Sequence, residues 1–287
     1  MVDLNNSVTY ENVKESAIHS FGVVATEDFS AKDEIRDRID YLKKYIKESG
    51  MRAIILGISG GVDSTTAGKL ACIAMQELVD EGYEAKFVAV RLPCHTQKDE
   101  SDAQMALDFM KPHVVHEINI GGAVDFLETE GLNSFGTEGG NFTPYEKDFN
   151  KGNMKARLRM AAQYYLAPFY KGIVLGTDHN AEGVLSFYTK FGDGACDILV
   201  LNGINKRQVR LLAKELGAPE KLWSKAPTAD LEDLQEGLLD EESTGVPYDV
   251  LDDFLEGKRI DHRLERKILE IYLSTTHKRT PVESFPY

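Results

Sequence analysis

The feature that most constrains this chain is a buried strand that runs into a glycine turn and then a helix. The apolar run AIIL at 53–56 is typical of a strand that is buried on both faces of a sheet. The chain then turns through Ser-Gly-Gly at 59–61, and from 67 to 78 the apolar residues recur at the spacing of one helix face. This arrangement predicts an anion site, because free backbone N–H groups and the positive end of the helix dipole face the turn.

The residues of the turn suggest how such an anion is held. Gly60 and Gly61 lack Cβ atoms, so the backbone can approach a ligand closely. Possible hydroxyl donors are Ser59, Ser64, Thr65 and Thr66. Asp63 is unexpected here, since a carboxylate repels a phosphate unless a cation lies between them, and it therefore indicates Mg²⁺. The alternative is a glycine-rich turn that binds nothing.

Composition limits the function classes. A chain of 287 residues that is 42% hydrophobic can form one large α/β domain, and we expect a single domain over 1–287. A formal net charge of −14 argues against a broad nucleic-acid interface. No 18-residue apolar run and no signal peptide is evident, so we expect neither a membrane span nor secretion. Scattered Cys72, Cys94 and Cys196 favour a cytoplasmic protein with reduced thiols.

The order of predicted elements indicates the fold. Strands are expected at 53–58, 86–92, 114–120 and 173–176. Helices are expected near 11–20, from 35 to Gly50, from 67 to 78, and at 102–110, 151–170 and 206–216, with a further helix after the turn 177–183. Asp178 is a plausible N-cap of that further helix, and Gly131–Thr143 reads as an exposed loop. The alternation predicts a doubly wound, Rossmann-like parallel sheet with helices on both faces, whose ligands lie at the carboxyl ends of the strands.

The turn resembles a known motif. It is not a Walker A loop, because no Gly-Lys-Ser/Thr follows the glycines. Ser-Gly-Gly-Val-Asp-Ser at 59–64 is instead similar to the PP-loop of the ATP pyrophosphatases. Together with other segments it resembles the ammonia-dependent NAD⁺ synthetases in residue type and order. Those segments are 57–64, 91–93, 153–157, 176–179, 189–194, 228–231 and 277–279. Val62, where relatives often carry Gln, and Cys94-His95 depart from the family pattern.

The resemblance implies an adenine nucleotide alpha-hydrolase-like fold and a C–N bond-forming ligase. This family amidates deamido-NAD⁺ to NAD⁺, the final step of NAD⁺ biosynthesis, with release of AMP and pyrophosphate from ATP. The reaction passes through an NAD-adenylate. No counterpart of the family's glutaminase domain is expected, which implies free ammonia as the nitrogen donor. The resemblance also implies a homodimer, and a C-terminal tail at 258–287 that reaches the substrate site.

The resemblance assigns roles to individual residues. Asp63, Glu182 and Lys206 are implied as catalytic, with Mg²⁺ held by Asp63 and Glu182. The implied ATP contacts are Gly57, Ile58, Ser59, Gly60, Gly61, Val62, Asp63, Ser64, Arg91, Gln97, Thr177, Lys206 and Thr228. The implied deamido-NAD⁺ contacts are Arg157, Lys190, Asp197, His277 and Lys278.

Each of these residues has an ordinary structural alternative. Glu182 and Lys206 could be solvated surface charges, and Arg91 could form only a salt bridge. Thr177 and Thr228 could be turn or cap residues. Among the remaining contacts, Lys155, Arg157 and Arg159 could form a solvated helix face, and His277 and Lys278 could belong to a loose chain end.

Three other functions are weighed against this one. A tRNA-thiolating PP-loop enzyme calls for a basic face and paired reactive cysteines, and the sequence shows neither. A GMP-synthetase-like ATPase lacks the Lys-Ala-Arg run at 155–157 and the Thr-Lys-Phe-Gly-Asp-Gly run at 189–194. A nucleotide-sensing module needs no metal and no opened α-phosphate, and so does not account for Asp63 and Glu182.

Overall fold

The structure is a computed structural model that describes residues 4, 7–96, 100–136, 141–228, 231–235, 237–282 and 284. Within this part of the chain, five parallel strands form one sheet in the order β3-β2-β1-β4-β5. The strands are β1 Ala53–Gly57, β2 Lys86–Arg91, β3 Val114–Glu117, β4 Gly172–Gly176 and β5 Ile198–Leu199. This confirms the prediction of a doubly wound α/β fold.

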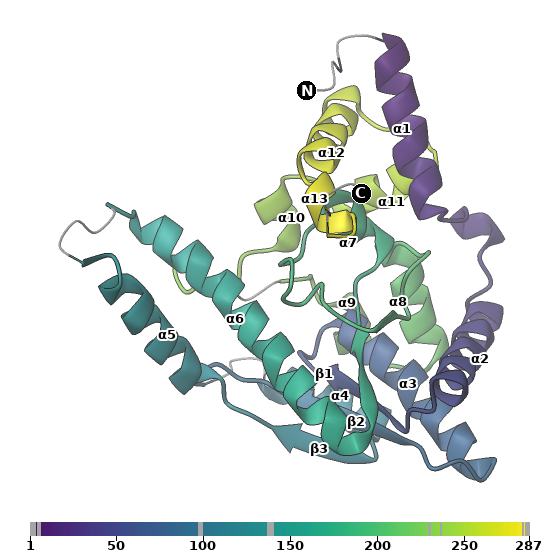
Figure 1. Cartoon of the computed structure of the whole chain (residues 1–287). Coiled ribbons are helices and arrows are strands. Elements are labelled where there is room, and N and C mark those ends of the chain that lie inside the picture. The colour runs from purple at the N-terminus through teal and green to yellow at the C-terminus, as the bar shows by residue number, and fades with distance from the viewer. Residues whose placement is uncertain are drawn as a thin grey trace.

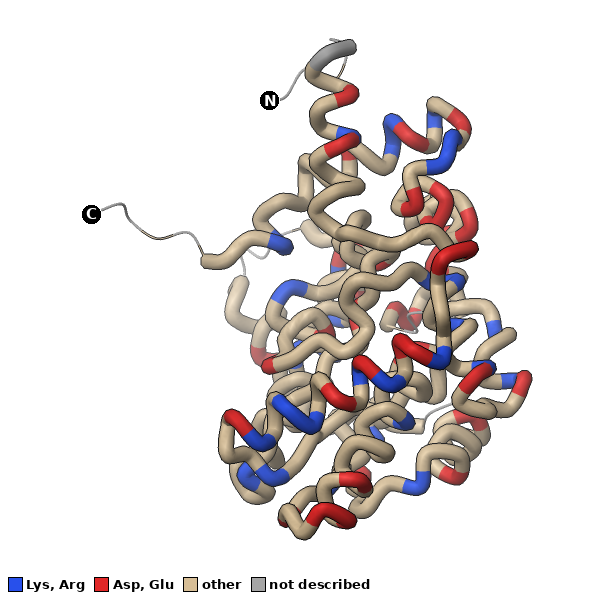
Figure 2. Tube along the Cα trace, turned by 90° about the vertical axis from the view of Figure 1, so that its right-hand side faces the viewer, with Lys and Arg blue, Asp and Glu red and all other residues tan. Residues whose placement is uncertain are grey.

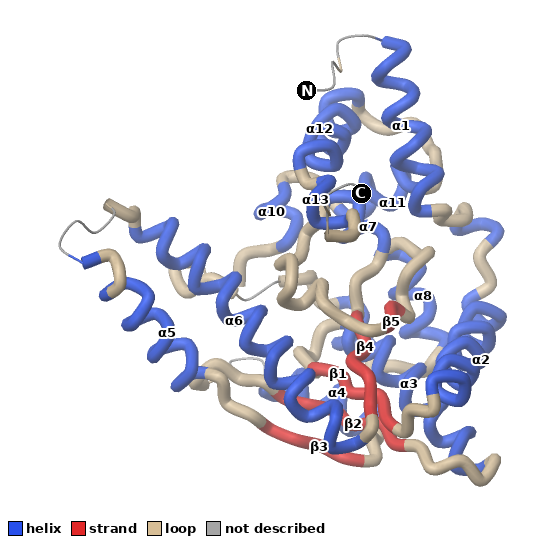
Figure 3. Tube along the Cα trace, in the orientation of Figure 1, coloured by secondary structure: helices blue, strands red, loops and turns tan. Residues whose placement is uncertain are grey.

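Helices cover both faces of the sheet, as Figures 1 and 3 show. They are α1 Ser7–Phe21, α2 Ala31–Ser49, α3 Val62–Asp80, α4 Glu100–Met110, α5 Gly121–Asn133, α6 Pro144–Leu166, α7 Asn180–Leu185, α8 Lys206–Glu215, α9 Glu220–Ser224, α10 Asp240–Thr244, α11 Tyr248–Leu255, α12 His262–Ser274 and α13 Thr276–Arg279. The short 3₁₀ helices include η1 Thr26–Asp28 and η3 Ala167–Tyr170.

The alternation of side chains along β1 divides the core between the two faces. Ile54 and Leu56 pack with α2, α3, α4 and α8, whereas Ile55 packs with residues of β2, α5 and α6 on the other face. A third cluster joins α1, α7, α11 and α12 above the carboxyl edge of the sheet. The N-terminal helix therefore packs on helices of its own chain.

Strand order determines where a site can form. The chain runs from β1 outward to β2 and β3, and then crosses back to place β4 on the other side of β1. Ile55 of β1 is paired with Val88 of β2 and Val174 of β4. Between β1 and β4 the winding reverses, and the loops after these two strands leave the same edge, which is where open α/β sheets bind ligands.

Four predicted boundaries are wrong. The expected exposed loop from Gly131 is helical as far as Asn133, and α6 begins at Pro144 instead of Lys151, because Thr143 and Glu146 form a capping box there. β3 ends at Glu117, before residue 120. The N-cap of α7 is His179 rather than Asp178.

Charge is mixed over the surface. Figure 2 shows acidic and basic segments interspersed along the helices that face the viewer. On α2, for example, Arg36 pairs with Asp40 in the same helix and with Glu77 of α3. None of the described helices is long and apolar enough to cross a membrane.

Candidate active site

The loop after β1 owes its shape to two close contacts. Gly60 has φ +87°, and a Cβ there would lie 2.7 Å from the backbone nitrogen of Ala103 at the start of α4. Only glycine allows this turn and this packing. The hydroxyl of Ser59 lies 3.1 Å from that of Ser64 and accepts the N–H of Gly61 at 3.3 Å. The loop is therefore folded around its own serines.

Only some of the predicted hydroxyl groups face the cavity next to the loop. Ser59 and Ser64 line it. Thr65 and Thr66 are buried in α3, and the hydroxyl of Thr66 donates to the carbonyl of Val62 at 2.7 Å. The expectation that both threonines supply donors to a ligand is wrong, because the helix begins at Val62 and turns them inward.

Four polar side chains meet where the loops after β1 and β4 approach the start of α8. The ammonium of Lys206 lies 2.8 Å from Oδ2 of Asp63, 3.2 Å from Nε2 of His179 and 3.9 Å from Oε1 of Glu182. The side chain of Lys206 is completely buried, whereas the side chains of Asp63 and Glu182 are 20% and 16% exposed. The surface alternative for Lys206 is therefore wrong, and Glu182 is not a solvated surface carboxylate.

The cluster is a mutually stabilised ion pair. Burial by itself would lower the pKa of Lys206, but the carboxylates of Asp63 and Glu182 outweigh it and raise that pKa. Burial likewise opposes ionisation of Asp63, but Lys206 and His179 hold the pKa of Asp63 below its usual value. Asp63 and Lys206 are therefore both charged at neutral pH, and Asp63 also lines the cavity described next.

A cavity of about 400 Å³ opens beside this cluster. Most of the residues that the sequence associates with ATP line it, namely Gly57, Ile58, Ser59, Gly61, Val62, Asp63, Ser64, Thr177 and Thr228. Glu182, a predicted magnesium ligand, lines it as well. Gly60 lies behind the loop against α4, and Lys206 reaches Asp63 from beneath the cavity wall. The residues predicted from distant parts of the sequence therefore do converge.

One further predicted ATP contact that the structure describes, Arg91, is not part of this wall. Arg91 is buried and forms ion pairs with Glu100 and Glu117, the salt-bridge alternative that the sequence left open. Gln97 lies outside the described residues. Contact of either residue with ATP stays a prediction.

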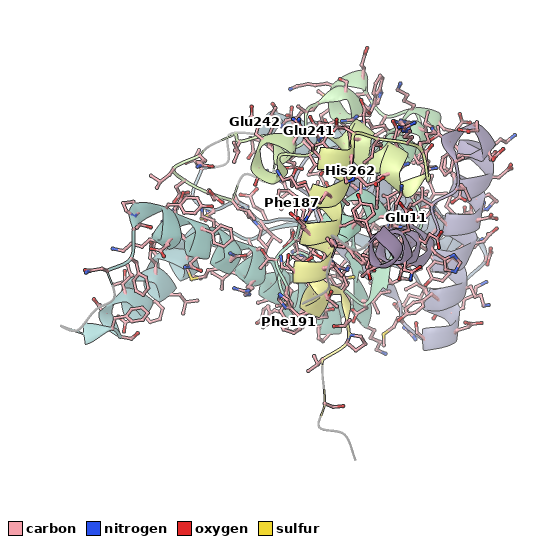
Figure 4. All side chains as sticks on the ribbon, turned by 90° about the horizontal axis from the view of Figure 1, so that it is seen from above. Glu11, Phe187, Phe191, Glu241, Glu242 and His262 are labelled. Atoms are coloured by element: carbon pink, nitrogen blue, oxygen red, sulfur yellow. The ribbon has the colours of Figure 1, made fainter. Side chains whose placement is uncertain are left out.

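The predicted deamido-NAD⁺ residues lie outside the cavity, and four of them gather near the C-terminal helices. The ammonium of Lys190 donates to the carbonyl of His277 at 2.5 Å, and Arg157 lies 3.4 Å from the carbonyl of Lys190. Lys278 donates to the carbonyls of Ser186 and Tyr188. Figure 4 shows Phe191 next to the yellow C-terminal helices.

Asp197 is separate from this group. Its carboxylate accepts the N–H of Val174 at 2.7 Å and the hydroxyl of Tyr164 at 3.3 Å, beside β4. On α6, Arg157 is exposed, which both the solvated-face alternative and a substrate contact allow. The solvated-face alternative is wrong for Lys155, which is buried and donates to the carbonyl of Leu231.

Several residues of the site were missed by sequence reasoning. Asp252 accepts the N–H groups of Lys206 and Arg207 and so caps α8, and Tyr248 lies against Lys206 with its hydroxyl on Asp240. All three belong to the acidic stretch 229–254, where nothing but the helical spacing of α11 marks Tyr248 and Asp252, and nothing marks Asp240 of α10.

The fold and this cavity define the class: the protein is an α/β nucleotide-binding protein of the PP-loop type. A family model described as NAD synthase matches residues 34–282. The chain belongs to the NAD synthase family.

Curated and solved relatives agree over most of the chain. The NH(3)-dependent NAD(+) synthetase of Aliivibrio salmonicida is 52% identical over 252 residues, which cover 87% of this chain and 91% of that protein. A crystal structure of NAD⁺ synthetase from Burkholderia pseudomallei is 42% identical, with a TM-score of 0.78 over 93% of this chain and 95% of that one. The structure of NMN synthetase from Francisella tularensis is 32% identical, with a TM-score of 0.77 over 91% and 100% of the two chains.

Proposed function

We propose that this chain amidates deamido-NAD⁺ with free ammonia and converts ATP to AMP and pyrophosphate. The observation that carries the proposal is the convergence of Asp63, Glu182 and Lys206 on a cavity lined by the loop 57–64. The name of the Aliivibrio salmonicida relative, an NH(3)-dependent NAD(+) synthetase, supports the same chemistry.

The reaction needs a carboxylate to be activated before ammonia can attack it. The nicotinate carboxylate attacks the α-phosphorus of ATP, a new O–P bond forms, and the bond to pyrophosphate breaks. Ammonia then attacks the acyl carbon, the C–O bond to AMP breaks, and the nitrogen loses a proton. Phosphoryl chemistry of this kind depends mainly on positioning and charge neutralisation.

The residues of the cavity suit the first step. Backbone N–H groups of the loop and the hydroxyls of Ser59 and Ser64 bind the two outer phosphates, with α3 directing its N-terminus at them. Lys206 supplies a fixed positive charge beneath them. The remaining ATP contacts that we assign are Gly57, Ile58, Gly60, Gly61, Val62, Arg91, Gln97, Thr177 and Thr228.

The carboxylates of Asp63 and Glu182 fit a magnesium ion. Their oxygens lie within 4.8 Å of one another, and both line the cavity. Mg²⁺ prefers oxygen ligands and usually completes its shell with substrate phosphates, so these two residues would hold it and the nitrogen of His179 is a poorer ligand. When bound, the ion would neutralise phosphate charge.

We assign the second substrate to the wall beyond the cavity. Arg157, Lys190 and Lys278 concentrate positive charge there, next to His277, in an acidic protein, where the phosphates of a dinucleotide need it. Asp197 can accept ribose hydroxyls. Because α1, α7, α11 and α12 share one core cluster and Lys190 contacts His277 of α13, we propose that residues 1–287 act as one domain and that its C-terminal part reaches the substrate.

We further propose a homodimer. The paired helices α5 and α6 project from the sheet, as Figure 1 shows. They and η3 expose large apolar side chains at Phe126, Tyr145, Phe149, Tyr165 and Phe169, and Phe135 is exposed just after α5. Monomeric proteins seldom expose so many large apolar groups on neighbouring elements, and a second copy of the chain would cover them.

One assay tests the central proposal. The protein is mixed with ATP, Mg²⁺, ammonium and deamido-NAD⁺, and NAD⁺, AMP and pyrophosphate are quantified. We expect the three products in equal amounts. Nicotinate mononucleotide replaces deamido-NAD⁺ in a parallel reaction, since a solved relative is an NMN synthetase. Faster turnover of the mononucleotide, or ATP cleavage that ignores deamido-NAD⁺, would contradict the proposed substrate.

A further inference from the structure

A tyrosine that the proposed chemistry does not use lies against the buried lysine of the site. The ammonium of Lys206 is 4.9 Å from the centre of the Tyr248 ring, on which His179 also packs at 6.0 Å. Tyr248 is buried, with 4% of its surface exposed. The ring therefore forms the wall of the Lys206 site, where a desolvated cation is attracted by the face of an aromatic ring.

The other end of the same side chain fixes a different part of the cavity. The hydroxyl of Tyr248 donates to Oδ2 of Asp240 at 3.0 Å, and both residues are buried. Asp240 lines the cavity, and its backbone N–H donates to the carbonyl of Pro227. Thr228 forms a bridge with Leu239. The hydroxyl is thus connected through Asp240 to Thr228, a proposed ATP contact.

The backbone of Tyr248 is held as firmly as its ring. Its N–H donates to Oε1 of Glu241 at 2.8 Å, and Figure 4 labels Glu241 and Glu242 on α10. Four residues further along α11, Asp252 accepts the N–H groups of Lys206 and Arg207 at the start of α8. Two side chains of α11 therefore hold Lys206: Asp252 accepts its backbone N–H, and the ring of Tyr248 contacts its ammonium.

We infer that Tyr248 is a positioning residue of the synthetase reaction: its ring holds the Lys206 ammonium against Asp63, and its hydroxyl holds the Thr228 segment through Asp240. The inference rests on the proposed function, because it assumes that Lys206 and Thr228 contact ATP. It predicts that ring and hydroxyl affect different kinetic constants. The hydroxyl acts on ATP binding through Thr228, and the ring acts on the charge that Lys206 offers to the reacting phosphates.

Two substitutions separate these roles. Tyr248→Phe keeps the ring and leaves Asp240 without its donor, and we expect KM for ATP to rise by about tenfold with a smaller change in kcat. Tyr248→Leu also removes the ring, and we expect kcat to fall by about a hundredfold. Both are measured by formation of NAD⁺ and pyrophosphate at saturating deamido-NAD⁺ and ammonium.

The chain contains a matched control. Tyr10 is also buried, and its hydroxyl donates to the buried carboxylate of Glu265 at 2.7 Å, between α1 and α12 and away from Lys206. Tyr10→Phe breaks the same kind of bond, so it is expected to lower the unfolding midpoint as Tyr248→Phe does, with kcat and KM unchanged. If both variants have the same kinetics at equal folded fraction, Tyr248 is only structural and the inference is overturned.

A double-mutant cycle tests the path through Asp240. If the hydroxyl acts through this carboxylate, Tyr248→Phe combined with Asp240→Asn raises KM for ATP by less than the product of the two single effects. Multiplicative effects would reject that path. Wild-type protein that makes no NAD⁺ would instead refute the proposed function. Should Tyr248→Leu fail to fold, Tyr248→Phe and the cycle still decide the question.

Discussion

The ammonium of Lys206 and the carboxylate of Asp63 approach to 2.8 Å although the two residues are 143 positions apart in the chain. Asp63 lies in the first turn of α3, directly after the loop that follows β1, and Lys206 lies in the first turn of α8, so the pair joins two parts of the fold. Lys206 has no exposed surface, whereas Asp63 also faces the cavity. Asp63 therefore both neutralises the lysine and remains available to a ligand.

We expect Asp63→Asn to abolish adenylation while the protein still folds. The change removes one proposed magnesium ligand, and loss of several kcal/mol of charge stabilisation corresponds to a rate loss on the order of a hundredfold or more. Removing one partner of a buried ion pair lowers the free energy of unfolding by about 3–5 kcal/mol. We expect a loss at the lower end of this range, because the carboxylate of Glu182 remains near Lys206. ATP–pyrophosphate exchange and circular dichroism test both points. Full exchange activity in this variant would remove the proposed metal role.

Removal of magnesium is expected to stop turnover, and readdition to restore it. Glu182→Gln should raise the Mg²⁺ concentration for half-maximal activity by about tenfold or more, since one charged oxygen ligand is lost. Glu270→Gln on α12 is the matched control, because its carboxylate is 56% exposed and pairs only with Arg266 among the contacts described. Equal magnesium titrations for the two variants would argue against Glu182 as a ligand.

Sequence reasoning predicted the inner strands and the loop after β1 because several signals agree there. The buried run at 53–56 and the following Ser-Gly-Gly each indicate the same structure. Helix α5 was missed for a physical reason: it buries little beyond Gly121 and Val124 and exposes Phe126, Leu127 and Leu132, so its sequence has no regular apolar period. The start of α6 was marked by Thr143, Pro144 and Glu146, a capping signal that was not used.

The site was predictable to a different degree for each residue. Asp63 alone could be inferred from its chemistry, because a carboxylate in an anion loop implies a cation. Glu182 and Lys206 needed the family resemblance, since nothing local distinguishes them from surface charges. Tyr248 and Asp252 act through contacts with Lys206 that only the packing of α11 on α8 creates.

We predict that the enzyme tolerates substitution of Cys94. It lines the cavity, but burial raises the pKa of its thiol, so the nucleophilic thiolate is scarce at neutral pH. The imidazole of the neighbouring His95 is hydrogen-bonded to Asp125, with Nε2 at 3.0 Å from Oδ1. We therefore expect Cys94→Ser to keep kcat within about twofold in a steady-state assay, a free-energy change of only about 0.4 kcal/mol. A substantial loss would show that the sulfur contributes to the reaction.

Asp252, which accepts two backbone N–H groups at the start of α8, predicts that the free energy of unfolding depends on pH. Burial raises the pKa of Asp252 from 3.8 to about 6, although two backbone N–H groups favour its charged form. The folded chain therefore binds this proton more tightly than the unfolded chain, and ionising Asp252 between about pH 4 and pH 6 lowers the free energy of unfolding, by about 3 kcal/mol in all.

Asp252→Asn removes this titration and, at every pH, one of the two hydrogen bonds to Lys206 and Arg207. The free energy of unfolding of the variant minus that of the wild type should consequently become more positive as the pH rises through this range. Urea denaturation at several pH values measures that difference. If it is constant with pH, the pKa of Asp252 is the same in the folded and the unfolded chain; if it becomes more negative, the carboxylate is stabilised by its two N–H donors more than it is penalised by burial.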